Sequence, residues 1–173
     1  MGTGVLILNN RNLKPLLYGG TGTESVKKSQ PEGLPEKFES GTQNMNGISG
    51  LKAGVDFVKN RGIKNIYNHE YKLAKRLFNG LANNRKVITY NKSFDYGKVA
   101  PVVSFNIDGV YSEDLVAKLN KYGIMTRGGL HCSPLAHTTM NTIENGTVRV
   151  VPGAFNTIND INYLLNVIRK LTN

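Results

Sequence analysis

Residues 63–81 read IKNIYNHEYKLAKRLFNGL, and this stretch decides the fold because its apolar side chains recur at the spacing of one helix face. A helix with one apolar face must bury that face against another part of the protein. We therefore predict an amphipathic helix that covers a hydrophobic core. Its apolar positions are Ile63, Ile66, Tyr67, Tyr71, Leu73, Leu77, Phe78 and Leu81.

The sequence before this helix is expected to be irregular over much of its length. Val5–Leu8 reads as a short buried strand, whereas residues 9–47 are rich in Gly, Pro, Ser and Asn, which favour turns. An irregular segment of this length in a compact domain is typically functional, so we expect a binding role. A further helix, ending at Gly62, is predicted from the helical spacing of Ile48, Leu51, Val55 and Val58.

The sequence after residue 82 predicts short strands and two more helices. Ser112 is expected to cap a helix that runs to Tyr122 and ends at Gly123, and Asn156 or Thr157 is expected to cap the terminal helix. Four mixed or antiparallel strands backed by helices form a small α+β domain. The predicted strands are Val87–Tyr90, Val99–Ile107, Ile124–Thr126 and Thr147–Val151.

Length and composition favour an ordinary globular protein. The 173 residues suit one domain, or one domain with a piece of another. No apolar run approaches the roughly 18 residues that span a bilayer, and the apolar stretch near the N-terminus is too short for a signal peptide. We therefore expect a cytoplasmic protein without a membrane partner. The single cysteine excludes an internal disulfide, and together with three histidines it forms no metal-ligand pattern.

The net charge of +10, from 22 Lys and Arg against 12 Asp and Glu, raises the question of an acidic partner. The positive charges are scattered along the chain and no basic run is interleaved with aromatic residues. We therefore interpret them as a solvated basic surface, and nucleic acid is not an expected partner.

Cys132 is the candidate nucleophile of the chain. It follows His131 and a glycine pair at the exit of a predicted strand, and glycines there allow a close approach of backbone to a ligand and leave the loop mobile. His131 and Arg127 are close enough in sequence to favour the thiolate, which is the reactive form. The alternative is a buried structural cysteine, which is among the most buried residue types.

Two further positions could recognise an anion. Arg149 lies within a valine-rich strand that reads as fully buried, so its charge requires a carboxylate from the protein or from a substrate. Gly41 and Thr42 form a turn whose amide and hydroxyl donors could hold a phosphate. The segment GGTGT, residues 19–23, is also permissive, but it lacks the Gly-Lys-Ser/Thr of a P-loop.

Taken together, these segments resemble the C-terminal part of class V aminotransferase-like enzymes, and among them most closely the cysteine desulfurases. The resemblance covers essentially the whole chain, with the motifs in family order, and RGGLHCSPLAH followed by GTVR and FNT is its most specific part. The segments are LKPLLYGGTGTES, LPEKFESGTQN, ISGLKAGVDFV, NHEYKLAKRL, RGGLHCSPLAH and GTVRVVPGAFNT.

This resemblance implies a fold-type-I pyridoxal-phosphate enzyme that works as a homodimer. Residues 1–62 would be a remnant of the large cofactor-binding domain and residues 63–173 the small C-terminal domain. The family takes sulfur from free cysteine, releases alanine and leaves a persulfide on the loop cysteine, here Cys132. A sulfur-acceptor protein is then a possible partner.

The resemblance also assigns roles to the other candidates. Arg149 would bind the substrate carboxylate, and Arg127 would support the loop or its charge. His131 would lie beside the nucleophile. Thr42, with Gly41 shaping its turn, matches the threonine that reaches the phosphate of the partner subunit's cofactor.

One departure from the family is important. Its members attach pyridoxal phosphate through a lysine just upstream of the GTG that opens this chain, and Lys14 lies on the wrong side of the predicted strand. No cofactor is therefore expected to bind covalently here, and this chain alone is expected to be incomplete and inactive. The alternatives are another class V aminotransferase or lyase, or a free-standing basic binding domain.

Overall fold

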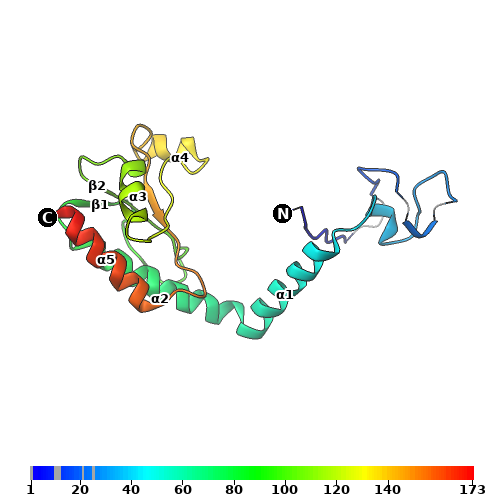
Figure 1. Cartoon of the computed structure of the whole chain (residues 1–173), viewed down its shortest axis with the longest axis horizontal. Coiled ribbons are helices and arrows are strands. Elements are labelled where there is room, and N and C mark those ends of the chain that lie inside the picture. Colours follow the sequence, from blue (N-terminus) through cyan, green and yellow to red (C-terminus); the bar gives the residue numbers. More distant parts are fainter. Residues whose placement is uncertain (1, 10–12, 21, 25) are drawn as a thin grey trace. The chain divides into compact units, whose positions relative to one another are not determined.

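The computed structural model describes residues 2–9, 13–20, 22–24 and 26–173, without the side chain of Thr23. The chain divides into two compact units, Met1–Arg61 and Gly62–Asn173, which are described separately below (Figure 1). The predicted irregular segment, residues 9–47, includes residues 10–12, 21 and 25, which lie outside the described part.

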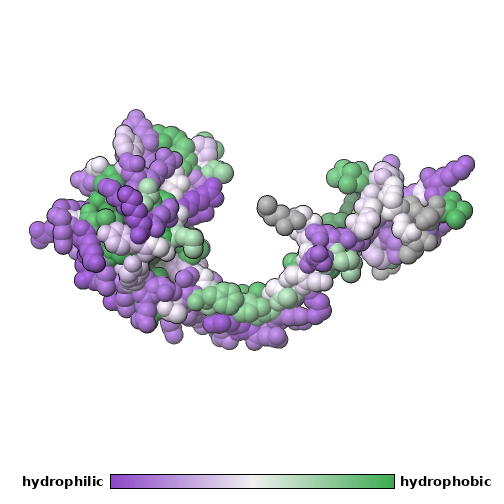
Figure 2. Space-filling view, in the orientation of Figure 1, coloured by the Kyte–Doolittle hydropathy of each residue, from purple (hydrophilic) through white to green (hydrophobic). Residues whose placement is uncertain are grey.

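The first unit consists of loops, two short 3-10 helices and one long helix. The 3-10 helices are η1 (Gly22–Glu24) and η2 (Glu36–Phe38), and the long helix is α1 (Met45–Arg61). The predicted helix is thus confirmed, and it begins at Met45, before Ile48, the first of its predicted apolar positions. In the described part of this unit Pro31 is the only buried residue, and Figure 2 shows hydrophobic atoms on its surface.

The predicted buried strand at Val5–Leu8 is wrong. The structure describes no strand there, and the side chains of Val5, Leu6 and Ile7 are 71%, 66% and 85% exposed. A strand needs a hydrogen-bonded neighbour to satisfy its backbone, and the described part of the first unit contains none. The apolar residues of this segment therefore have no sheet to join within this unit.

The second unit is an α+β domain, as predicted. Its described strands form one antiparallel sheet in the order β1-β2-β3. Helices α2 and α5 pack against each other, α2 also contacts β1 and β2, and α3 contacts β2 and β3. The elements are α2 (Ile63–Ala82), β1 (Val87–Thr89), β2 (Val103–Ile107), α3 (Ser112–Asn120), α4 (Pro134–Thr139), β3 (Val148–Val150) and α5 (Ile158–Thr172).

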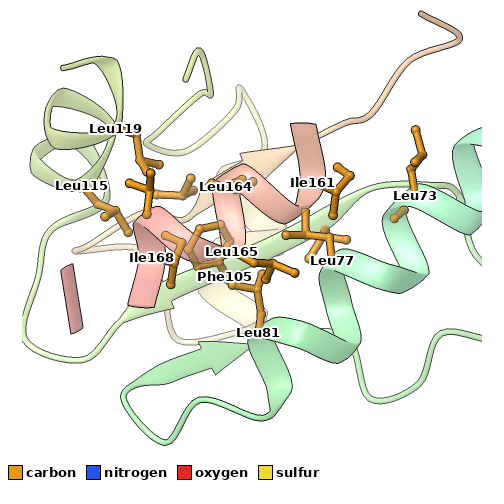
Figure 3. Close-up of a cluster of buried hydrophobic side chains, with 14 of the residues drawn as sticks. Leu73, Leu77, Leu81, Phe105, Leu115, Leu119, Ile161, Leu164, Leu165 and Ile168 are labelled. Carbon is orange, nitrogen blue, oxygen red and sulfur yellow. The ribbon is translucent and has the colours of Figure 1, made fainter. Parts of the chain in front are cut away.

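The hydrophobic core lies where the three longer helices meet one face of the sheet (Figure 3). Phe105, in the central strand, is fully buried at its centre. Leu77 and Leu81 reach it from α2, and this confirms the helix face predicted from residues 63–81 except at Ile63, which is 75% exposed. The other large contributions come from α3 and α5: Leu115, Leu119, Ile161, Leu164, Leu165 and Ile168.

Alternation along β2 gives the sheet two different faces. Val103, Phe105 and Ile107 belong to the core, so Ser104 and Asn106 between them point to the opposite face. In β3, Val148 belongs to the core and Arg149, which is paired with Ser104, shares the polar face. The candidate site is built on this second face.

The sheet has three strands where four were predicted. Residues Ile124–Thr126 form no strand, and a single antiparallel bridge between Arg127 and Arg149 replaces the expected pairing. The glycine pair that follows turns the chain away before a ladder can extend. The short helix α4 was not predicted, because six residues are too few for a periodic pattern.

The predicted helix caps are confirmed in one case and wrong in the other. Thr157 caps α5 in a capping box: its hydroxyl accepts from the N–H of Asp160, whose carboxylate accepts from the N–H of Thr157. Ser112 is instead the first residue of α3, and Tyr111 occupies the cap position. The Ser112 hydroxyl makes contacts outside the helix that are described below.

We predict that Leu77→Ala lowers the free energy of unfolding by about 2–5 kcal/mol, because it empties a fully buried position at the centre of the core. Leu135→Ala is the matched control, since this side chain is 83% exposed; it should change the stability by less than about 0.5 kcal/mol. Urea unfolding followed by circular dichroism measures both. Equal effects of the two variants would contradict the core described here.

Candidate active site

The loop that carries Cys132 begins on the sheet. The N–H of Arg149 donates to the carbonyl of Arg127 at 2.8 Å, and the N–H of Arg127 donates to the carbonyl of Arg149 at 3.4 Å. These two bonds attach the start of the loop to β3. The loop then runs through Gly128 and Gly129 to Cys132 and enters α4 at Pro134.

Cys132 is exposed, so the alternative of a buried structural cysteine is wrong. Both His131 and Cys132 have left-handed backbone angles, with φ of 53° and 57°, which non-glycine residues adopt only when the surroundings hold them there. The guanidinium Nη2 of Arg127 lies 4.0 Å from Sγ of Cys132. The thiol is therefore accessible and lies beside a positive charge.

His131 is held by the strand behind the loop. Its Nε2 lies 3.0 Å from the carbonyl oxygen of Thr147, and because a carbonyl only accepts, Nε2 carries the proton. The unprotonated Nδ1 is buried and has no hydrogen-bond partner in the described part of the chain. Burial lowers the pKa of His131, and the charges of Arg149, His137 and Arg127 lower it further, against the opposing bond to Thr147.

Arg149 projects from the sheet into a small pocket of about 240 Å³. The residue is half-buried, so the prediction of a fully buried strand position is wrong. No ion pair or hydrogen bond of its guanidinium occurs within the described residues. Of the two predicted partners, a carboxylate from the protein is therefore not found among the described residues.

His131 and Ser133 also line this pocket, so its wall includes both neighbours of Cys132 in sequence. Tyr90 and Ser104 complete the side formed by the sheet. Burial raises the pKa of the Tyr90 hydroxyl, although a hydrogen bond from Asn106 acts in the opposite direction. The pocket thus combines one unpaired cation with neutral polar groups, and this suits a small anionic ligand.

Tyr90 and Ser104 were not singled out from the sequence. The polar positions of the alternating strand VSFNI were the available signal, because Ser104 and Asn106 must share the face opposite the core. Nothing local indicates that Tyr90, in the connection after β1, lies over that same face.

Gly41 and Thr42 lie in the first unit, whereas Cys132 lies in the second. The backbone at Gly41 has φ of 80°, and its N–H donates to the carbonyl of Gly20 at 3.1 Å. Its amide is therefore already used. Thr42 is exposed and lies with Lys14, Lys27 and other lysines around an open hollow. The turn at Gly41 and Thr42 thus presents the Thr42 hydroxyl close to several lysine side chains.

The part of the chain that the structure describes shows neither a metal centre nor a membrane helix. The described residues contain no group of three His, Cys, Asp or Glu side chains placed to hold a metal ion. Among the helices of that same part of the chain, none is both long and apolar enough to cross a membrane.

We predict that the imidazole of His131 titrates below its ordinary value of 6.5. The unfolded chain then binds this proton more readily than the folded chain, so stability is lost as the pH falls through and below 6.5 and is fully present above it. His131→Asn should flatten this part of the profile. Histidine Cε1–H NMR gives the midpoint, with the urea-unfolded chain as reference. A folded midpoint equal to or above the unfolded one would contradict the prediction.

Comparison with known proteins places this chain in a family. A family model described as aminotransferase class-V matches residues 1–164. A "probable cysteine desulfurase" from Pyrococcus abyssi is 35% identical over 98% of this chain and 43% of its own length. A cysteine desulfurase from Haloferax volcanii is 36% identical over 71% of this chain and 29% of its own length.

Solved structures of cysteine desulfurases are also similar to this chain. The apo structure of a cysteine desulfurase from Thermococcus onnurineus matches with a TM-score of 0.73 and 35% identity, over 80% of this chain and 34% of that one. The cysteine desulfurase CsdA from Escherichia coli matches with a TM-score of 0.69 and 26% identity, over 79% of this chain and 32% of that one. The chain thus spans less than half the length of these relatives. It belongs to the aminotransferase class-V family.

Proposed function

We propose that this chain is the C-terminal part of a pyridoxal-phosphate-dependent cysteine desulfurase whose persulfide forms on Cys132. The observation that carries the proposal is an exposed cysteine beside Arg127, whose neighbours in sequence, His131 and Ser133, line the same pocket as Arg149. Relatives of 35% and 36% identity that are described as cysteine desulfurases support it.

The proposed reaction balances without an external oxidant. The Sγ atom of Cys132 bonds to the sulfur of a free cysteine, the carbon–sulfur bond of that cysteine breaks, and its carbon takes a proton. Alanine leaves and Cys132 carries the sulfur as a persulfide. The carbon is reduced and the two sulfur atoms are oxidised to the same extent.

In this proposal Arg149 binds the substrate carboxylate. A guanidinium can form two parallel hydrogen bonds with a carboxylate, and half-burial strengthens the attraction between the two charges. A pocket of about 240 Å³ accommodates a small amino acid. Because no acidic residue among those described neutralises Arg149, the substrate need not displace an internal partner.

Arg127 and His131 have different roles in the proposed site. Arg127, 4.0 Å from Sγ, stabilises negative charge on the attacking sulfur. His131 lines the pocket, and the bond between its Nε2 and the carbonyl of Thr147 holds the imidazole in place.

The cofactor fits this chain only in part. When bound, pyridoxal phosphate supplies the electron sink that the breaking bond requires. The Thr42 hydroxyl, in the turn shaped by Gly41, would bind the phosphate held by the other subunit of a homodimer. No lysine of this chain corresponds to the residue that attaches the cofactor in the family, so we propose that the chain alone is inactive. The exposed Val5, Leu6 and Ile7 suit a surface that another part of the enzyme covers.

We predict that Cys132→Ser in the intact enzyme abolishes persulfide formation and sulfur transfer, because the acceptor sulfur is removed. Mass spectrometry of the enzyme after incubation with cysteine detects the persulfide. Thr139→Ala, an exposed change in the same region, should leave transfer unchanged. Full sulfur transfer by Cys132→Ser would contradict the desulfurase assignment. It would favour an aminotransferase or a lyase, which does not need this thiol.

We predict that the 173-residue chain, incubated with cysteine and pyridoxal phosphate, produces no alanine. The coding sequence upstream of Met1 provides a second check, since a lysine codon shortly before the GTG segment would support the proposed division. Alanine formation by the chain alone would contradict it.

We predict that Arg149→Lys in the intact enzyme raises the KM for cysteine about tenfold or more, because lysine keeps the charge and loses the paired hydrogen bonds, worth about 1.5–3 kcal/mol. Arg85→Lys is the matched control, since Arg85 is exposed and lies outside the pocket. Steady-state kinetics measures both. An unchanged KM in Arg149→Lys would remove this residue from the substrate site.

A further inference from the structure

We propose that Ser112 and Asn106 are positioning residues that hold the cysteine loop so that the thiol of Cys132 lies beside Arg127. The proposal rests on the function assigned to Cys132 above. Neither residue touches the thiol. Each acts through the backbone of the loop or of the turn on which the loop rests.

Ser112 joins the loop to the start of α3. The side chain is 1% exposed, and its hydroxyl accepts a hydrogen bond from the N–H of Gly129 at 3.1 Å. The same hydroxyl donates to the carbonyl of Asn145 at 2.6 Å. One buried group thus links the cysteine loop to the turn that precedes β3.

Asn106 holds that turn from the sheet. This side chain is 5% exposed; its Nδ2 donates to the carbonyl of Gly146 at 2.8 Å, and its Oδ1 accepts from the N–H of Val148 at 3.3 Å. Thr147 lies between Gly146 and Val148, and its N–H donates to the carbonyl of Gly129 at 3.1 Å. The links from Ser112 and from Asn106 therefore converge on Gly129.

The glycines of the loop make this close packing possible. A Cβ atom at Gly128 would lie 2.9 Å from the carbonyl oxygen of Ser112, and one at Gly146 would lie 2.6 Å from Cα of Gly129. The close approach expected for this loop is thus an approach to the protein's own backbone.

The consequence for the site is geometric. His131 and Cys132 follow Gly129 by two and three residues and adopt left-handed angles that their surroundings must impose. A loop released at Gly129 would lose that restraint, and the 4.0 Å separation between Arg127 and Sγ would increase. Loss of the Ser112 hydroxyl should therefore change the electrostatic environment of the thiol as well as the stability of the domain.

The single cysteine of the chain allows a direct test. Cys132 is alkylated in parallel with neutral iodoacetamide and anionic iodoacetate, and the ratio of the iodoacetate rate to the iodoacetamide rate reports the positive charge near the sulfur. A change in stability or accessibility alone alters both rates alike. Arg127→Gln defines the ratio without the guanidinium.

We expect Ser112→Ala to lower this ratio toward that of Arg127→Gln, a fall of up to about fivefold for charges 4 Å apart in water. Asn106→Leu should lower it in the same direction. Ser112→Thr, which keeps the hydroxyl, should restore it. Thr172→Val is the matched control, since it removes a buried hydroxyl that bonds to Asn84 and to α5, far in sequence from the loop.

Only variants that keep the native circular dichroism spectrum are compared. A ratio unchanged from wild type in folded Ser112→Ala or Asn106→Leu would overturn the proposal, and so would an equal fall in Thr172→Val. The measurement needs neither cofactor nor free cysteine. If the positioning proposal fails this test, the desulfurase assignment is unaffected. If Cys132→Ser retains sulfur transfer, the desulfurase assignment fails, but the alkylation ratio of the wild-type chain does not change.

Discussion

The register between β2 and β3 places Phe105 opposite Val148 and Ser104 opposite Arg149. Because side chains alternate along a strand, this pairing sends the two apolar residues into the core and the two polar residues to the other face. A slip of one residue would pair Phe105 with Arg149 and so place the guanidinium on the same face as the core residue Phe105. Both the core and the candidate pocket therefore depend on this one ladder.

The electrostatics of the polar face follow from what surrounds Arg149. Arg127 pairs with it through the backbone, so two guanidinium groups start from neighbouring positions, and the described residues provide no carboxylate to neutralise either. Burial lowers the pKa of His131, and the charges of Arg149, His137 and Arg127 lower it further. The face thus concentrates positive charge where a small carboxylate and a thiolate would need it.

The two units of the chain differ in how far they are complete as packed structures. The second has a continuous core from α2 to α5, whereas in the described part of the first Pro31 is the only buried residue. The relatives are more than twice as long as this chain, as the 43% and 29% coverage of their lengths indicates. The role of Thr42 toward a cofactor therefore remains a proposal, and so does the homodimer.

Local patterns predicted much of the fold. The helices at residues 63–81 and 158–172 were predictable because apolar residues at helical spacing define a face within a few turns, and Thr157 with Asp160 forms its capping box within one turn. The strand at Val5–Leu8 was predicted wrongly, since its apolar composition says nothing about whether a partner strand exists. The extra strand at Ile124–Thr126 failed for another reason: a partner exists in β3, but the chain makes only one bridge to it, at Arg127, before the glycine pair turns it away.

The sequence by itself determined the α+β class, the position of the core helices and the identity of Cys132, Arg127, His131 and Arg149 as candidates. Only the tertiary structure decided that Cys132 is exposed, that Arg149 has no protein partner among the described residues, and that Ser112 and Asn106 hold the loop. The physical reason is distance along the chain: the hydrogen bonds from Ser112 to Gly129 and from Asn106 to Gly146 span 17 and 40 residues, and contacts of that separation leave no periodic signal in the sequence.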